Sequence, residues 1–138
     1  MGWDNSHMHA FRIGKIDYAG IETVEHCGPP IRDEDSFTLA ALIKRKGQVF
    51  DYKYDFGDSW EHEIKLESVL PWDPDLRLPI CLAGARACPP EDCGGVVGYE
   101  RVLDALGDPN NAKRAEFRQW VGQFDPEKFD LEKVNSKL

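Results

Sequence analysis

The chain of 138 residues has no long apolar run and no excess of positive charge. No segment approaches the ~20 consecutive apolar residues that span a bilayer, which excludes a transmembrane helix. Lysine and arginine number 17 against 25 aspartates and glutamates, which gives a net charge of −8. An acidic surface repels phosphate backbones, so the charge balance makes nucleic acid an unfavourable partner for the surface as a whole.

The first residues also lack the basic and apolar regions of a secretory signal, so the sequence predicts a cytoplasmic protein. In that compartment the four cysteines are expected to be thiols or metal ligands rather than disulfides. Their spacing lacks the paired CxxC pattern of a zinc ribbon, and no G-x-S-x-G, P-loop or HExxH motif is present. A composition of 41% hydrophobic and 30% charged residues instead predicts a single globular domain over residues 1–138.

Two stretches show apolar residues with a period of two. Residues 7–13 alternate and predict a strand, and residues 50–56 and 60–66 alternate on either side of Gly57-Asp58-Ser59. The second pattern predicts a β-hairpin with one buried and one solvated face, in which Gly57 is expected to supply the positive φ of the turn. Residues 15–35 are expected to form a long irregular connection, with a short strand near residues 21–24.

Helical patterns come mostly after the hairpin. A first helix is predicted earlier, over residues 37–46, with Asp35 or Ser36 as its cap and Gly47 at its end. Residues 71–90 are rich in proline and predict an irregular segment. Further helices are predicted over residues 96–106 and 111–121, with a last one opened by Asp125-Pro126. The predicted fold class is therefore α+β: an antiparallel sheet with a central β-hairpin, covered by C-terminal helices.

The strand parity places three of the four histidines on the apolar side of the sheet, namely His7, His9 and His62. A buried ring nitrogen without a partner costs about 1–3 kcal/mol, so each imidazole requires one. Carboxylates or backbone carbonyls are the favoured partners, and a metal ion is the alternative. Zinc is the candidate ion, although no cofactor is certain. The candidate metal ligands are His7, His9, His62, Cys88 and Cys93.

Acidic and aromatic residues near the same strand ends complete a candidate binding site, in which Asp58 is expected to orient His62. The leading hypothesis is an interaction or ligand-binding module with no named partner. One alternative is a metal-assisted hydrolase with Asp58 or Glu91 as base. Another is a mobile-element accessory that binds DNA through Lys113, Arg114 and Arg118. The candidate binding residues are Asp4, His7, His9, Asp55, Asp58, Trp60, His62, Glu91 and Asp92.

Three motifs carry a resemblance to a known family: GWDNSH at residues 2–7, YDFGDSWEH at residues 54–62 and ACPPEDCGG at residues 87–95. In this order they resemble the plasmid pRiA4b ORF-3-like family. The resemblance implies an α+β fold. Some members are labelled as resolvases or companions of mobile elements, but this chain has no resolvase-type serine motif. Members usually begin with further strands and a helix that this chain lacks. We therefore expect an open sheet edge along residues 7–13 and a homodimer through that edge.

Overall fold

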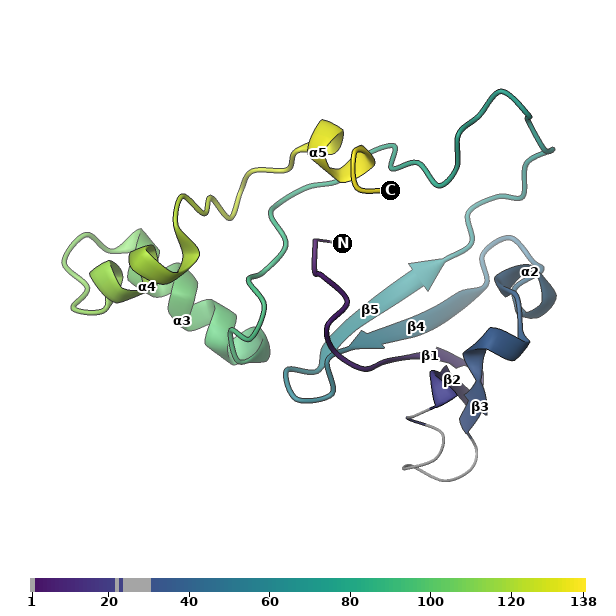
Figure 1. Ribbon diagram of the computed structural model, residues 1–138, viewed down its shortest axis with the longest axis horizontal. Helices are drawn as coiled ribbons and strands as arrows, with labels where there is room; N and C mark the ends of the chain where they lie inside the picture. Colours follow the sequence, from purple (N-terminus) through teal and green to yellow (C-terminus); the bar gives the residue numbers. More distant parts are fainter. Residues whose placement is uncertain (1, 22, 24–30) are drawn as a thin grey trace. The chain divides into compact units, whose positions relative to one another are not determined.

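The computed structural model describes residues 2–21, 23 and 31–138 (Figure 1). The chain separates into two compact units, each with its own architecture. Unit 1 consists of Met1–Asp4 and Asp73–Leu138, and unit 2 consists of Asn5–Trp72. That residues 1–138 form a single domain stays a prediction.

Unit 2 is built on a five-stranded sheet with the order β3-β2-β1-β4-β5 (Figure 1). Neighbouring strands are antiparallel except for β2 and β3, which are parallel. The predicted α+β class is therefore confirmed, with a mixed and mostly antiparallel sheet, and the hairpin lies at one side of it with β5 as the edge. The strands are β1 His9–Ile13, β2 Ile16–Ala19, β3 Ile31–Asp33, β4 Val49–Tyr54 and β5 Trp60–Lys65.

The hairpin forms where the sequence predicts it, but its turn is built differently. Positive φ values occur at Asp55 (53°) and Ser59 (57°) and not at Gly57, so the prediction for Gly57 was wrong. The reason is the Asp55 carboxylate, whose Oδ1 accepts the backbone N–H of Gly57 at 2.8 Å and of Asp58 at 3.3 Å. The Ser59 N–H then donates to the Asp55 carbonyl at 2.6 Å. The side chain of one aspartate thus fixes the turn.

The segment predicted to be irregular, residues 15–35, contains the two strands β2 and β3. β2 follows β1 after two turn residues, and the first of them, Gly14, has φ +66°. Of the strand predicted near residues 21–24, Ile21 and Thr23 are helical, which contradicts it, and the other two positions lie outside the described residues. β1 has a neighbour on each side, so the expected open edge along residues 7–13 is absent. The homodimer stays a prediction.

A 3₁₀ turn and a short helix follow β3. The turn η1 spans Glu34–Ser36, and α2 spans only Leu39–Leu42 of the helix predicted over residues 37–46. The cap is Thr38, whose side chain accepts the Ala41 N–H, and not Asp35 or Ser36. The helix ends early because Ile43 turns into the core, where it is 8% exposed.

The two faces of the sheet differ in chemistry, because residues paired across antiparallel strands point to the same side. One face, which we name the histidine face, carries aromatic and imidazole rings. The opposite face, which we name the charged face, carries ionisable groups. The histidine face includes His9, Phe11, Tyr18, Phe50, Tyr52, Tyr54, Trp60, His62 and Ile64, and the charged face includes Arg12, Asp17, Asp51, Lys53, Glu61 and Glu63.

Unit 1 is helical: it contains α3 Gly95–Gly107, α4 Arg114–Val121 and α5 Leu131–Asn135. The first confirms the helix predicted over residues 96–106. α4 begins later than residue 111 because the Asn111 side chain accepts the Lys113 N–H and holds a turn there. Asp125 likewise closes a turn, by accepting the Glu127 N–H, and the last helix is capped by Asp130.

Residues 66–94 form no helix or strand, in agreement with the predicted irregular region. Contacts from the end of the chain hold part of this segment. The Cys81 N–H donates to Asn135 Oδ1 at 2.8 Å, and Asn135 Nδ2 donates to the Cys81 carbonyl at 3.0 Å. The Ala87 N–H donates to the Pro126 carbonyl at 2.9 Å. Within the described part of the chain, no helix combines the length and apolar character needed to cross a membrane.

Candidate functional site

His7 lies at the entrance to β1 and faces a buried carboxylate. Its Nδ1 is 3.9 Å from Asp55 Oδ2, and its ring meets the edge of Tyr54 with centroids 5.9 Å apart. Asp55 is 8% exposed, although the strand alternation predicts a solvent-exposed side chain at this position. It is drawn inward because its N–H donates to the Met8 carbonyl and its carboxylate organises the turn. Asp55 therefore orients both the turn and His7.

His9 meets a carboxylate that the sequence did not single out. His9 Nε2 lies 3.1 Å from Glu34 Oε1, and the two side chains are 24% and 22% exposed. The second carboxylate oxygen, Glu34 Oε2, is buried and has no hydrogen-bond partner among the described residues. A buried acceptor left unpaired costs on the order of 1–3 kcal/mol. Glu34, in η1, therefore brings a buried and unpaired oxygen next to the histidine face.

His62 is held by the backbone of its partner strand. Its Nδ1 lies 3.1 Å from the Tyr52 carbonyl oxygen, which can only accept, so Nδ1 carries a proton. Asp58 was expected to orient this imidazole. This role of Asp58 stays a prediction, and the carboxylate of Asp55, also in the turn, faces His7. Trp60 lies opposite Tyr54 in the register.

Tyr52 lies at the centre of the histidine face. Its ring centroid is 4.9 Å from that of Phe11, 5.6 Å from that of His9 and 5.7 Å from that of His62. Burial raises the pKa of Tyr52, and the nearby Tyr54 and Glu34 raise it further. The phenol therefore stays protonated at neutral pH and keeps a hydroxyl that can donate.

His9 and His62 each have an acceptor within hydrogen-bond distance, and His7 faces a carboxylate at 3.9 Å. Among the described residues of unit 2, no three histidine, cysteine or acidic side chains bring ligand atoms within 4.8 Å of one another. His7 faces a carboxylate, His9 another and His62 a carbonyl. Zinc bound by His7, His9, His62, Cys88 and Cys93 stays a prediction.

The cysteine motif belongs to unit 1, where the N-terminal residues contact it. Trp3 Nε1 donates to the Pro89 carbonyl at 3.0 Å, and the Asp4 N–H donates to Glu91 Oε1 at 2.9 Å. Burial raises the pKa of Cys88, although backbone N–H groups of Gly2 and Trp3 oppose this effect. Cys88 is therefore a thiol at neutral pH and a weak nucleophile.

Glycines fix the backbone that follows the cysteine motif. Asp92, Gly94 and Gly95 all have positive φ, at 55°, 88° and 65°. A Cβ at Gly98 would lie 1.8 Å from the Cys93 carbonyl oxygen, so α3 packs directly against this loop. Cys93 Sγ contacts the Gly95 carbonyl at 3.8 Å. These contacts give the loop that holds Glu91, Asp92 and Cys93 a defined conformation.

The basic residues proposed for DNA binding have structural partners in unit 1. Arg114 Nη1 donates to the Leu106 carbonyl, and Arg118 Nη1 donates to the carbonyls of Gly122 and Phe124 at 3.1 and 3.2 Å. Lys113 is the N-cap residue of α4. Two of the three cationic groups therefore stabilise the ends of helices, and the contacts give DNA binding no support.

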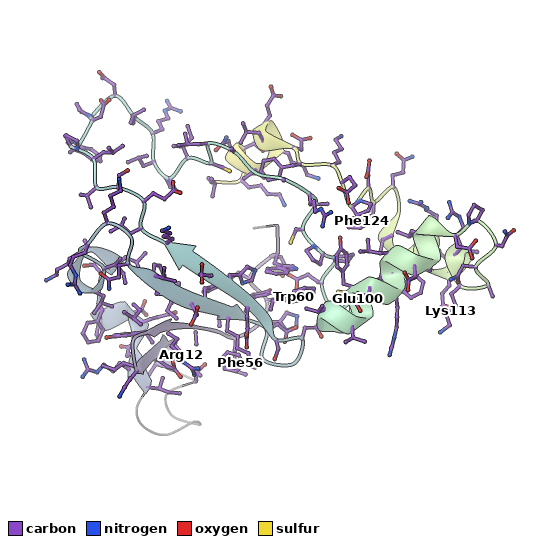
Figure 2. All side chains as sticks on the ribbon, turned by 180° about the vertical axis from the view of Figure 1, so that it is seen from behind. Arg12, Phe56, Trp60, Glu100, Lys113 and Phe124 are labelled. Carbon is purple, nitrogen blue, oxygen red and sulfur yellow. The ribbon has the colours of Figure 1, made fainter. Side chains whose placement is uncertain are left out.

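The charged face holds a cavity that the sequence did not predict. Its volume is about 540 Å³, and besides these charged residues its lining includes Ala10, Thr23, Ile31, Phe56 and two residues of the histidine face, Tyr52 and His62. In Figure 2, Arg12 and Phe56 lie on the same side of the strands. Arg12 donates to both oxygens of Asp17 at 2.7 and 2.9 Å, which lowers the pKa of Asp17. Alternating charges in a strand usually mark a solvated surface, so the pattern gave no signal of a hollow.

Comparison with known proteins agrees with the motifs. The family model described as plasmid pRiA4b ORF-3-like protein matches residues 1–133. The chain belongs to this family. It is 38% identical over 125 residues to the protein named "Uncharacterized protein y4hQ" of Sinorhizobium fredii, covering 91% of this chain. The match spans 63% of that relative, less than two thirds of its length.

A solved structure of the same fold supports the architecture. The crystal structure titled "Protein of Unknown Function MM3350" from Methanosarcina mazei Go1 matches with a TM-score of 0.81 and 34% identity. The alignment covers 96% of this chain and 75% of the other. That protein and this chain therefore share the α+β fold described above.

Proposed function

We propose that this protein is a small ligand-binding module whose site is the histidine face of unit 2. The observation that carries the proposal is the placement of three imidazoles beside aromatic rings. Hydrogen bonds orient His9 and His62, and His7 faces a carboxylate. Oriented polar groups on a largely apolar floor are typical of ligand sites. The alternatives of a hydrolase and of a mobile-element accessory stay predictions that no contact favours.

The chemistry of the face indicates a small planar ligand with a polar edge. The rings of Phe11 and Tyr52 lie 4.9 Å apart and offer flat apolar contact. His9 and His62 flank Tyr52 at 5.6 and 5.7 Å and add hydrogen-bonding groups at either side. A ring of the ligand can stack on the aromatic floor while its polar edge meets an imidazole.

The test is a titration of the ¹⁵N-labelled chain with benzoate, benzylamine and adenosine, followed by amide chemical shifts. We expect saturable shifts that cluster on His9 and Phe11, which do not line the cavity of the charged face, for at least one compound. Phe11→Ala should abolish them, whereas Glu63→Ala on the charged face should leave them unchanged. Absence of saturable shifts with all three compounds, or shifts clustered on Arg12 and Asp51, would overturn the proposal.

A further inference from the structure

The pair His9 and Glu34 has an unusual hydrogen-bond balance. The two residues lie 25 positions apart in the sequence and meet at 3.1 Å between Nε2 and Oε1. One carboxylate oxygen is bonded to the imidazole, while Oε2 is closed to solvent without a partner in the described part of the chain. Buried polar atoms are nearly always bonded, so an exception of this kind indicates a missing positive group.

The atoms of this pair suit a metal ion better than an organic cation. Imidazole nitrogen and carboxylate oxygen are both zinc ligands, and two ligands at ~2.0 Å in tetrahedral geometry lie about 3.3 Å apart. The observed 3.1 Å separation is close to that value. Each side chain remains about one quarter exposed, which gives an ion access from solvent.

We propose that His9 Nε2 and the Glu34 carboxylate bind one divalent transition-metal ion of the zinc type. The ion replaces the proton between the two groups, the imidazole carries its proton on Nδ1, and water supplies the other ligands. This inference rests on the proposed function, because His9 belongs to the histidine face, and it names the first ligand of that face. It differs from the five-residue set predicted from the sequence, since Glu34 joins His9 in place of His7, His62 and the two thiols.

The test uses Zn²⁺ alone, titrated into the metal-free full chain by calorimetry. We expect one equivalent to bind, with His9→Gln and Glu34→Gln each weakening the affinity by about tenfold or more. The matched control is Glu63→Gln, which removes a carboxylate from the charged face and should change the affinity less than about twofold. Circular dichroism checks that every variant is folded. Side-chain ¹⁵N spectra should show that Zn²⁺ shifts the ring signals of His9 and leaves those of His62.

Several results would overturn this site. They are no binding of Zn²⁺, unchanged affinity in both variants, or Co²⁺ spectra with thiolate charge-transfer bands, which would place the ion on cysteines. The two proposals also fail separately. If an organic compound shifts the histidine face but Zn²⁺ does not bind, the metal site is wrong and the proposed function stands. If Zn²⁺ binds at His9 and Glu34 and no organic compound binds, the reverse holds.

Discussion

The two faces of the unit 2 sheet come from the same strands, yet different forces hold them. On the histidine face Tyr54 is 2% exposed, and Tyr18 and Phe50 are also buried. On the charged face the next residue along β4, Lys53, has a 38% exposed side chain, and its ion pair with Glu61 is 3.8 Å long. Apolar burial is worth much more than exposed ion pairs. Most of the stabilising energy therefore comes from the histidine face, so substitutions on the charged face should cost less.

The largest loss of stability should come from removing a buried side chain of the histidine face. Tyr54→Ala should lower the free energy of unfolding by about 3–5 kcal/mol, because it removes one of the largest fully buried side chains. Lys53→Ala, one residue away on the charged face, should cost less than about 1 kcal/mol. Urea unfolding measures both. Equal losses at the two positions would contradict the difference between the faces.

A smaller effect concerns coupling within each face. A double-mutant cycle on Phe11 and Tyr52, whose rings lie 4.9 Å apart, should give about 1 kcal/mol of interaction energy. The same cycle on Lys53 and Glu61 should give about 0.3 kcal/mol and weaken with added salt. A larger coupling on the charged face would reverse the ranking.

The Arg12–Asp17 pair predicts how the charged face responds to acid. The hydrogen bond from Arg12 lowers the pKa of Asp17, so this stabilisation is fully present above the unfolded aspartate pKa of about 4. It is lost as the pH falls through the lower pKa of the folded state. The Arg12 side chain is 64% exposed, which screens the pair, so Asp17→Asn should cost about 0.5 kcal/mol at neutral pH. The deficit should vanish in unfolding measurements well below pH ~4. A deficit independent of pH would show that the charge is not its cause.

The smallest effect should be a gain. Asp51 and Glu63 face each other in the register of β4 and β5, and like charges in this position repel. Glu63→Lys should therefore raise the free energy of unfolding by about 0.3 kcal/mol. Glu67→Lys, which makes the same charge change beyond the strand, is the control and should change it less. A loss on Glu63→Lys would show that the carboxylate at position 63 has a stabilising partner.

The sequence predicts the elements in which a regular pattern of apolar residues continues over many positions. The hairpin and α3 each extend over enough residues for alternation or a helical stripe to emerge. β2 and β3 were missed because they have four and three residues, and Gly14 and Gly20 interrupt the pattern around β2. β3 also pairs in parallel, a relation that no turn between neighbouring strands signals.

The candidate site was predicted in part, and for the same reason. Strand parity placed His9 and His62 on one face correctly. Glu34 lies in an acidic run that is typical of a solvated loop, and only the chain path after β3 brings it to His9. The role of Asp55 was missed because turn statistics favour glycine for positive φ. A carboxylate that accepts two backbone N–H groups outweighed that preference.

The two hydrogen bonds between Cys81 and Asn135 affect the order in which the chain can fold during synthesis. The two residues are 54 positions apart, so on the ribosome the irregular segment emerges long before the amide that satisfies its backbone. In the same way, the Ala87 N–H lacks its native acceptor until Pro126 has been synthesised. Unit 2 comes almost entirely from the earlier part of the chain and can close during synthesis. The proline-rich stretch acquires these contacts only after residues 126 and 135 have been synthesised.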